Sequence, residues 1–177
     1  MINERMLTAI NEQIKNELES SYLYLSMTAY FHSESLDGMA HWMRCQTNEE
    51  IVHAMKFYNF IIDRGAQVKL LNLSQLKTNW ASPIEAWKDA YKHEQQITGN
   101  INDLITIARE EKEYASEPLL AWFVEEQIEE EANVSKVVEQ LEILENDKPG
   151  LLMLDRELGG RAFLQGSPFD PLSIKNA

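Results

Sequence analysis

The sequence has a single cysteine, Cys45, and few helix-breaking residues, with 7 glycines and 5 prolines in 177 residues. One cysteine cannot form a disulfide within the chain, and metal sites built from several cysteines are excluded. So little glycine and proline favours long helices over a turn-rich β fold. No apolar run approaches the roughly 20 residues of a membrane span. The N-terminus also lacks the pattern of a signal peptide, so we expect a soluble protein in the cytoplasm.

Positive charge is also scarce, with 16 Lys and Arg residues against 29 Asp and Glu residues and a net charge of −13. Nucleic acid and anionic membranes carry charge of the same sign, so we expect neither as a partner. A negative field of this kind raises the local concentration of cations. The simpler alternative is that the acidity only keeps the protein in solution.

Apolar periodicity predicts four long helices and a short fifth one, over approximately residues 4–31, 38–64, 83–112, 117–146 and 151–158. The clearest start is Ser82-Pro83 with Glu85, a typical helix N-terminus. Pro149-Gly150 is expected to separate the fourth and fifth helices. Residues 1–160 therefore form one domain, and residues 161–177 are expected to be an irregular C-terminal tail.

The lengths of the connections predict the topology. The first two helices are joined by a short break, as are the third and fourth, so each pair is expected to be an antiparallel hairpin. Residues 65–82 form a longer connection, which extends to roughly 56 Å, whereas a helix of about 28 residues is about 42 Å long. The connection can cross the whole bundle and make the second and third helices parallel. We predict an all-α four-helix bundle with one long crossover.

The apolar face of each long helix is interrupted near its middle by polar residues. These residues are Glu17 in the first helix, Glu50 and His53 in the second, Glu94 in the third, and Gln127 and Glu130 in the fourth. Because the midpoints of aligned helices meet, the six side chains are expected to converge. A buried carboxylate is costly unless it is paired or binds a metal. Any one of them alone is better explained as a satisfied core residue, but all six at one level favour a metal pair.

The spacing of Glu50 and His53 suits two metal ions. Residues three apart lie on one helical face, about 5–6 Å apart at Cβ, so Glu50 can bridge two ions while His53 binds one. Oxygen-rich ligands with one imidazole favour iron over zinc. In di-iron bundles, two helices each supply a Glu and two supply Glu-x-x-His. Here Gln127-x-x-Glu130 replaces the second Glu-x-x-His.

These motifs resemble those of the bacterial non-haem ferritins over approximately residues 1–160. The matching motifs are Glu17 with Tyr24, Glu49-Glu50-Ile51-Val52-His53, Lys92-His93-Glu94 and Glu126-Gln127-Ile128-Glu129-Glu130-Glu131. Bacterioferritins, in contrast, repeat Glu-x-x-His and place a haem-binding methionine after the bridging glutamate. Ile51 stands at that position, so we expect no haem. The tail, residues 161–177, departs from the family, whose chains usually end sooner.

The resemblance implies a ferritin-like four-helix bundle, a cage of twenty-four identical subunits, ferroxidase activity and storage of an iron(III) mineral. Fe(II) and either O2 or H2O2 would be the reactants. The implied first iron site is Glu17, Glu50 and His53, and the second is Glu50, Glu94 and Glu130 with Gln127 close by. The implied third iron site is Glu49, Glu126, Glu129 and Glu130.

Several alternatives stay open at this point. Glu49, Glu126 and Glu129 are also consistent with a solvated acidic face. Tyr24 lies one heptad after Glu17, where its phenol is placed to hydrogen-bond a ligand or to supply an electron during oxygen reduction, or where it serves only as a core residue. The whole bundle is also consistent with a di-iron peroxidase or oxidase that stores no iron, or with a non-catalytic acidic scaffold.

Overall fold

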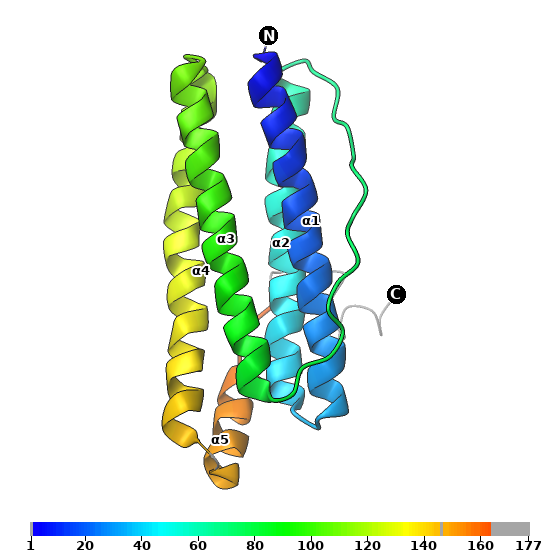
Figure 1. The fold of residues 1–177 in the computed structure, drawn as a ribbon, viewed down its shortest axis with the longest axis vertical. Helices are drawn as coiled ribbons and strands as arrows, with labels where there is room; N and C mark the ends of the chain where they lie inside the picture. Colours follow the sequence, from blue (N-terminus) through cyan, green and yellow to red (C-terminus); the bar gives the residue numbers. More distant parts are fainter. Residues whose placement is uncertain (1, 146, 164–177) are drawn as a thin grey trace.

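The computed structural model describes residues 2–145 and 147–163, and these residues form helices without a strand. Figure 1 shows four long helices side by side and a short fifth helix at one end. The long helices are α1 (Glu4–Ser33), α2 (Asp37–Asp63), α3 (Pro83–Glu110) and α4 (Glu117–Leu144). A 3-10 turn, η1 (Tyr114–Ser116), precedes α4, and α5 (Lys148–Leu158) follows it. The predicted all-α bundle is confirmed.

The crossover between α2 and α3 runs along the full length of the bundle (Figure 1). The two helices are consequently parallel, whereas α1 with α2 and α3 with α4 form antiparallel hairpins. Hydrogen bonds hold the crossover against α1: the backbone N–H of Lys69 donates to Asn11 Oδ1 at 2.7 Å, and that of Ser74 donates to Glu19 Oε1 at 2.7 Å. Parallel α2 and α3 bring the middles of all four helices to one level.

The helix ends follow local signals in the sequence. At the start of α3, Ser82 Oγ accepts a hydrogen bond from the Glu85 backbone N–H at 3.3 Å, and Pro83 is the first helical residue. Proline suits this position because its missing N–H would lack a helical partner anyway. At the end of α2, Gly65 has a φ of 70°, which glycine adopts without strain.

The predicted start of the fifth helix was wrong. Helix α5 begins at Lys148, so Pro149 and Gly150 lie in its first turn instead of before it. Proline is tolerated there for the same reason as in α3. A Cβ atom at position 150 would lie 2.4 Å from Leu144 Cδ2, so the end of that leucine side chain would have to shift.

Helix α5 is fixed to the beginning of α2. The Met39 backbone N–H donates a hydrogen bond to Asp155 Oδ1 at 2.8 Å, which satisfies one of the unpaired N–H groups at the start of α2. A Cβ atom on Gly38 would lie 1.7 Å from the Asp155 carbonyl oxygen. Only glycine at 38 allows the two helices to approach this closely.

The core has two apolar clusters with a polar layer between them. One contains Phe31, Met39 and Trp87 near the α5 end, and the other contains Ile14, Phe57 and Phe123. Among the described residues, no helix is both long and apolar enough to cross a membrane. The tail expected at 161–177 is described only to residue 163, and the rest of it lies outside the described residues.

Candidate metal centre

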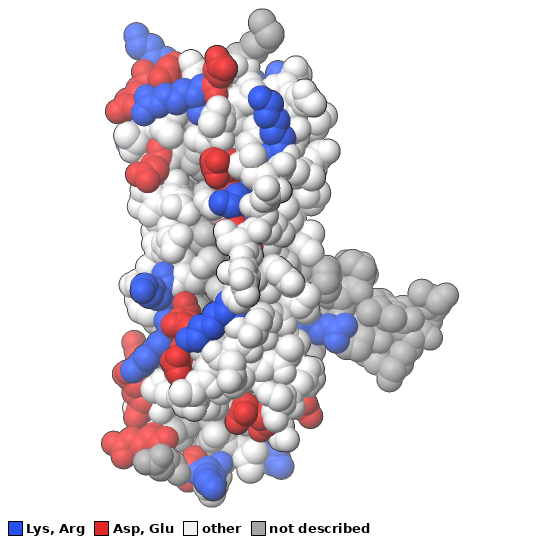
Figure 2. Space-filling model, turned by 45° about the vertical axis from the view of Figure 1, so that its right-hand side comes forward, with Lys and Arg blue, Asp and Glu red and all other residues white. Residues whose placement is uncertain are grey.

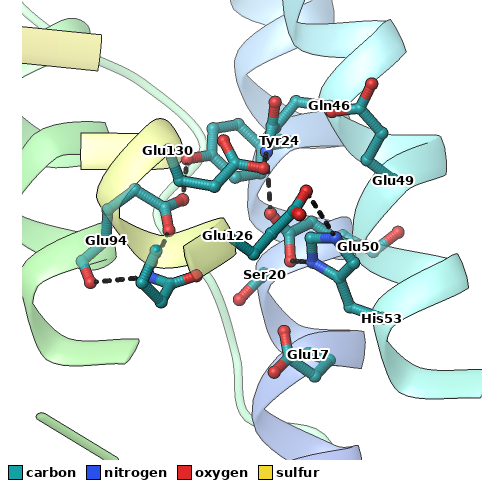
Figure 3. Close-up of polar contacts among 12 residues, drawn as sticks. Glu17, Ser20, Tyr24, Gln46, Glu49, Glu50, His53, Glu94, Glu126 and Glu130 are labelled. Carbon is teal, nitrogen blue, oxygen red and sulfur yellow. Dashed lines mark hydrogen bonds and ion pairs between the residues drawn. The ribbon is translucent and has the colours of Figure 1, made fainter. Parts of the chain in front are cut away.

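The polar layer is built by side chains from all four long helices (Figure 3). None of them exposes more than 4% of its surface. They are Glu17 and Tyr24 from α1, Gln46, Glu50 and His53 from α2, Glu94 from α3, and Gln127 and Glu130 from α4. The helix midpoints place ionisable groups where water cannot solvate them, so each depends on its neighbours for stabilisation.

The first predicted iron site is gathered in the structure. Glu17, Glu50 and His53 each offer a ligand atom, and these three atoms lie within 4.8 Å of one another. His53 Nδ1 lies 3.4 Å from Glu50 Oε2. The Glu17 carboxylate accepts a hydrogen bond from Gln13 at 2.8 Å through Oε1, while its Oε2 is buried and has no hydrogen-bond partner among the described residues.

The residues of the second predicted site lie close together, but their carboxyl groups accept hydrogen bonds from different donors. The Tyr24 hydroxyl donates to Glu94 Oε1, and Gln127 Nε2 donates to Glu94 Oε2 at 3.2 Å. Glu130 Oε1 accepts a hydrogen bond of 2.7 Å from Gln46, while Glu130 Oε2 is buried without a partner among the described residues. Each of the two carboxyl groups thus accepts hydrogen bonds from its own donors, Glu94 from Tyr24 and Gln127 and Glu130 from Gln46.

Of the three predicted iron sites, the third has its residues brought together least closely. Its residues Glu49, Glu126, Glu129 and Glu130 line one cavity of about 430 Å³. Glu126 is half-buried and leans toward His53, with 3.6 Å between its Oε1 and the imidazole Nε2. Glu129 is exposed, and Glu49 faces Arg161 instead. His53, Glu126 and Glu130 form the second three-ligand group among the described residues.

Burial and mutual repulsion hold protons on the carboxyl groups. Burial, with repulsion from Glu50, raises the pKa of Glu17 and of Glu94 to about 8. Burial beside Glu94 and Glu50 raises the pKa of Glu130 well above its ordinary value. Burial alone would lower the pKa of His53, but hydrogen bonds with Glu126 and Glu50 raise it to about 11.

Glu50 behaves differently from the other carboxyl groups. Its burial favours the protonated form, but the hydrogen bond with His53 and the charge on that imidazole lower the pKa of Glu50. At neutral pH the layer therefore holds an imidazolium–carboxylate pair surrounded by protonated carboxyl groups. Metal ions bind the deprotonated forms, so ions entering this layer would displace protons.

Gln46 within the layer and Trp122 beside it were not predicted from the sequence as residues of the site. Gln46 Nε2 donates both to Glu50 Oε1 at 3.0 Å and to Glu130 at 2.7 Å, so one amide joins α2 to α4. In the sequence, the signal for Gln46 was an amide side chain on the otherwise apolar face of its helix. The Trp122 ring packs edge-on against His53 at 5.6 Å, and Lys56 Nζ lies 3.9 Å from the ring centroid. Trp122 lies off the core face, so spacing could not identify it.

The layer fits iron by the chemistry of its donors. It offers four carboxyl groups and one imidazole, with no thiolate, and this is the mixed oxygen and nitrogen set that suits Fe(II). Two of its carboxylate oxygens, on Glu17 and Glu130, are buried without a hydrogen-bond partner among the described residues. A buried, unpaired acceptor is costly, and a bound cation would satisfy it.

A four-helix bundle with one long crossover and a carboxylate layer at its centre defines the ferritin-like class. Residues 7–144 match the family model described as the ferritin-like domain. The chain belongs to the ferritin family.

Similar proteins cover nearly the whole chain. A bacterial non-heme ferritin of Bacteroides fragilis is 38% identical over 161 residues, which is 91% of this chain and 100% of the relative. One from Staphylococcus aureus is 36% identical and covers 92% and 98%. The crystal structure of an open-pore ferritin from Archaeoglobus fulgidus has a TM-score of 0.90, 44% identity and coverage of 92% and 100%. The sequence-based resemblance to bacterial non-haem ferritins is confirmed.

Proposed function

We propose that the protein oxidises Fe(II) in the central layer and stores the iron(III) product within a shell made of copies of the same chain. The observation that carries the proposal is the pair of buried oxygens, Glu17 Oε2 and Glu130 Oε2, which have no hydrogen-bond partner among the described residues. Membership in the ferritin family supports iron storage and ferroxidase activity in general terms.

The proposed ligands divide the layer into two iron positions. Glu17, Glu50 and His53 hold the first ion, and Glu50, Glu94 and Glu130 hold the second, with Gln127 beside it. Glu50 is the bridging ligand because it belongs to the first three-ligand group and is joined to Glu130 through Gln46. Glu49, Glu126 and Glu129, with Glu130, form a third position at the mouth of the layer.

The residues supply positions and charge, while iron and the oxidant supply the redox chemistry. Two Fe(II) ions each lose one electron, and one O2 takes both electrons and two protons to give H2O2. With H2O2 as the oxidant, the two electrons and two protons give two water molecules instead. The protons displaced from Glu17, Glu94 and Glu130 are available for this step. Tyr24 orients Glu94 through its hydroxyl group.

The molecular surface supports assembly with further copies. Figure 2 shows the side that carries the crossover, where charged side chains gather toward the two ends and leave a largely uncharged stretch between them. Exposed apolar side chains lie on α1 and on the crossover: Tyr22, Leu25, Leu70, Leu71 and Leu73. Exposed apolar surface marks interaction sites where it is large and contiguous. We propose that the exposed apolar surface packs against other subunits in a cage of twenty-four. We also propose that the cage contains no haem and is located in the cytoplasm.

One experiment tests the function. Fe(II) is added to the metal-free protein in air, while near-ultraviolet absorbance, oxygen consumption and particle size are followed. We expect fast oxidation of about two ions per chain, one at each of the first two proposed positions, and then retention of much more iron in large particles. A Glu50→Gln variant should lose the fast phase. Oxidation without retained iron would indicate a di-iron oxidase or peroxidase, and no oxidation would indicate a scaffold.

A further inference from the structure

The segment that follows α5 is attached to the outer side of α2. The Arg161 guanidinium contacts the Glu49 carboxylate, and its Cζ lies 4.2 Å from the centroid of the Trp42 ring. The Arg161 carbonyl oxygen lies 2.7 Å from His41 Nε2, and Phe163 packs edge-on against the same imidazole at 5.0 Å. Contacts of the guanidinium, the backbone and the next aromatic residue therefore fix Arg161 in one place.

Arg161 lines the same cavity as Glu126, Glu129 and His53. Its side chain is only 19% exposed and that of Glu49 is 21% exposed, so the pair is partly shielded from water. Burial raises the pKa of Glu49, and the positive charge of Arg161 opposes that shift. The second guanidinium nitrogen, Nη1, is buried without a hydrogen-bond partner among the described residues. The guanidinium is thus the cation that balances Glu49 at the mouth of the iron layer.

We propose that Arg161 is a built-in counter-cation of the third iron position and competes with metal for Glu49. This inference rests on the proposed function. A guanidinium stays protonated in proteins, so Arg161 cannot give way by losing a proton, as His53 can. An incoming ion must displace the whole side chain from Glu49. Arg161 is therefore a positioning residue that lowers the affinity of the third position and leaves the first two unaffected.

Anaerobic calorimetric titration of the metal-free protein with Fe(II) tests this proposal. We expect two tight ions and a weaker third one per chain in the unmodified protein. Arg161→Gln should tighten the third ion about tenfold, which corresponds to about 1.4 kcal/mol, with the first two unchanged. Arg161→Met, which keeps the packing on Trp42, should give the same result if the glutamine variant folds poorly. Arg161→Lys should keep the weak third ion.

Lys56 offers a matched control, because it lines the same cavity without a described contact to Glu49. Lys56→Gln removes one positive charge and should leave the third affinity close to that of the unmodified protein. An unchanged third affinity in both Arg161→Gln and Arg161→Met would overturn the inference, as would equal tightening in Lys56→Gln. The absence of a third ion from every variant would also overturn it. The absence of the two tight ions from the unmodified protein would instead overturn the proposed function.

Discussion

The hydroxyl group of Tyr24 on α1 donates a hydrogen bond to the carboxyl group of Glu94 on α3, inside the buried layer. The two helices belong to different hairpins, so this bond joins the two halves of the bundle at the proposed second iron position. Burial raises the pKa of Glu94, and the bond from Tyr24 opposes that rise. The phenol therefore favours the ionised carboxylate that binds metal.

A Tyr24→Phe variant should bind the second Fe(II) ion more weakly. Loss of a hydrogen bond to a charged group costs about 1.5–3 kcal/mol, so we expect affinity to fall by at least tenfold. Anaerobic titration measures this affinity, and the first ion, for which we propose Glu17, Glu50 and His53 as ligands, serves as the internal control. An unchanged second affinity would mean that Tyr24 is only a packing residue.

The metal-free protein should lose stability as pH rises. Glu17 and Glu94 have an ordinary pKa of 4.5 and a folded-state pKa of about 8. A raised folded-state pKa contributes stability that is complete below the unfolded value and is lost as pH rises through the folded value. Between the two values each group makes the free energy of unfolding fall as pH rises. The melting temperature should therefore fall between pH 5 and pH 8.

The control for this pH dependence is Glu17→Gln, which keeps the shape of the protonated group but cannot titrate. Its melting temperature should fall less steeply over the same range. An equally steep fall in the variant would contradict the raised pKa of Glu17.

Replacement of Gln46 by leucine should destabilise the metal-free protein more than the metal-loaded one. Gln46 donates to both Glu50 and Glu130, and an unsatisfied buried polar group costs about 1–3 kcal/mol. A bound cation would stabilise the same oxygens in place of the amide. Melting temperatures with and without Zn(II) measure the difference. Equal losses in the two states would show that Gln46 acts through packing alone.

Gly38→Ala should be strongly destabilising, because the new Cβ atom would lie 1.7 Å from the Asp155 carbonyl oxygen. Overpacking costs about 1–3 kcal/mol or more, and here the backbone of α5 has to move. Gly99→Ala in α3 is the matched control, since nothing lies within 4 Å of its Cβ position. That variant should gain about 0.5–1 kcal/mol from helix propensity. Denaturant unfolding compares the two, and similar effects would contradict the tight contact of α2 with α5.

Periodicity predicted the parts of the structure that repeat along a helix. Glu17, Glu94 and Glu130 interrupt apolar faces, so their burial at one level followed from the sequence. The start of α5 did not, because proline in a first turn and proline after a helix end look alike in sequence. The position of Arg161 did not either, since its segment has no periodic pattern. The contact of Glu126 with His53 did not either, because it depends on how the side chains of α2 and α4 pack across the bundle.

The division of the layer between two hairpins has a consequence during synthesis. A chain still emerging from the ribosome carries Glu17, Glu50 and His53 long before Glu94 and Glu130 have been translated. The crossover then has to place α3 parallel to α2 before the second set of ligands meets the first. A half-made chain would therefore lack one of the two iron positions proposed above. Oxidation of Fe(II) at the proposed positions would wait until all four long helices have been made.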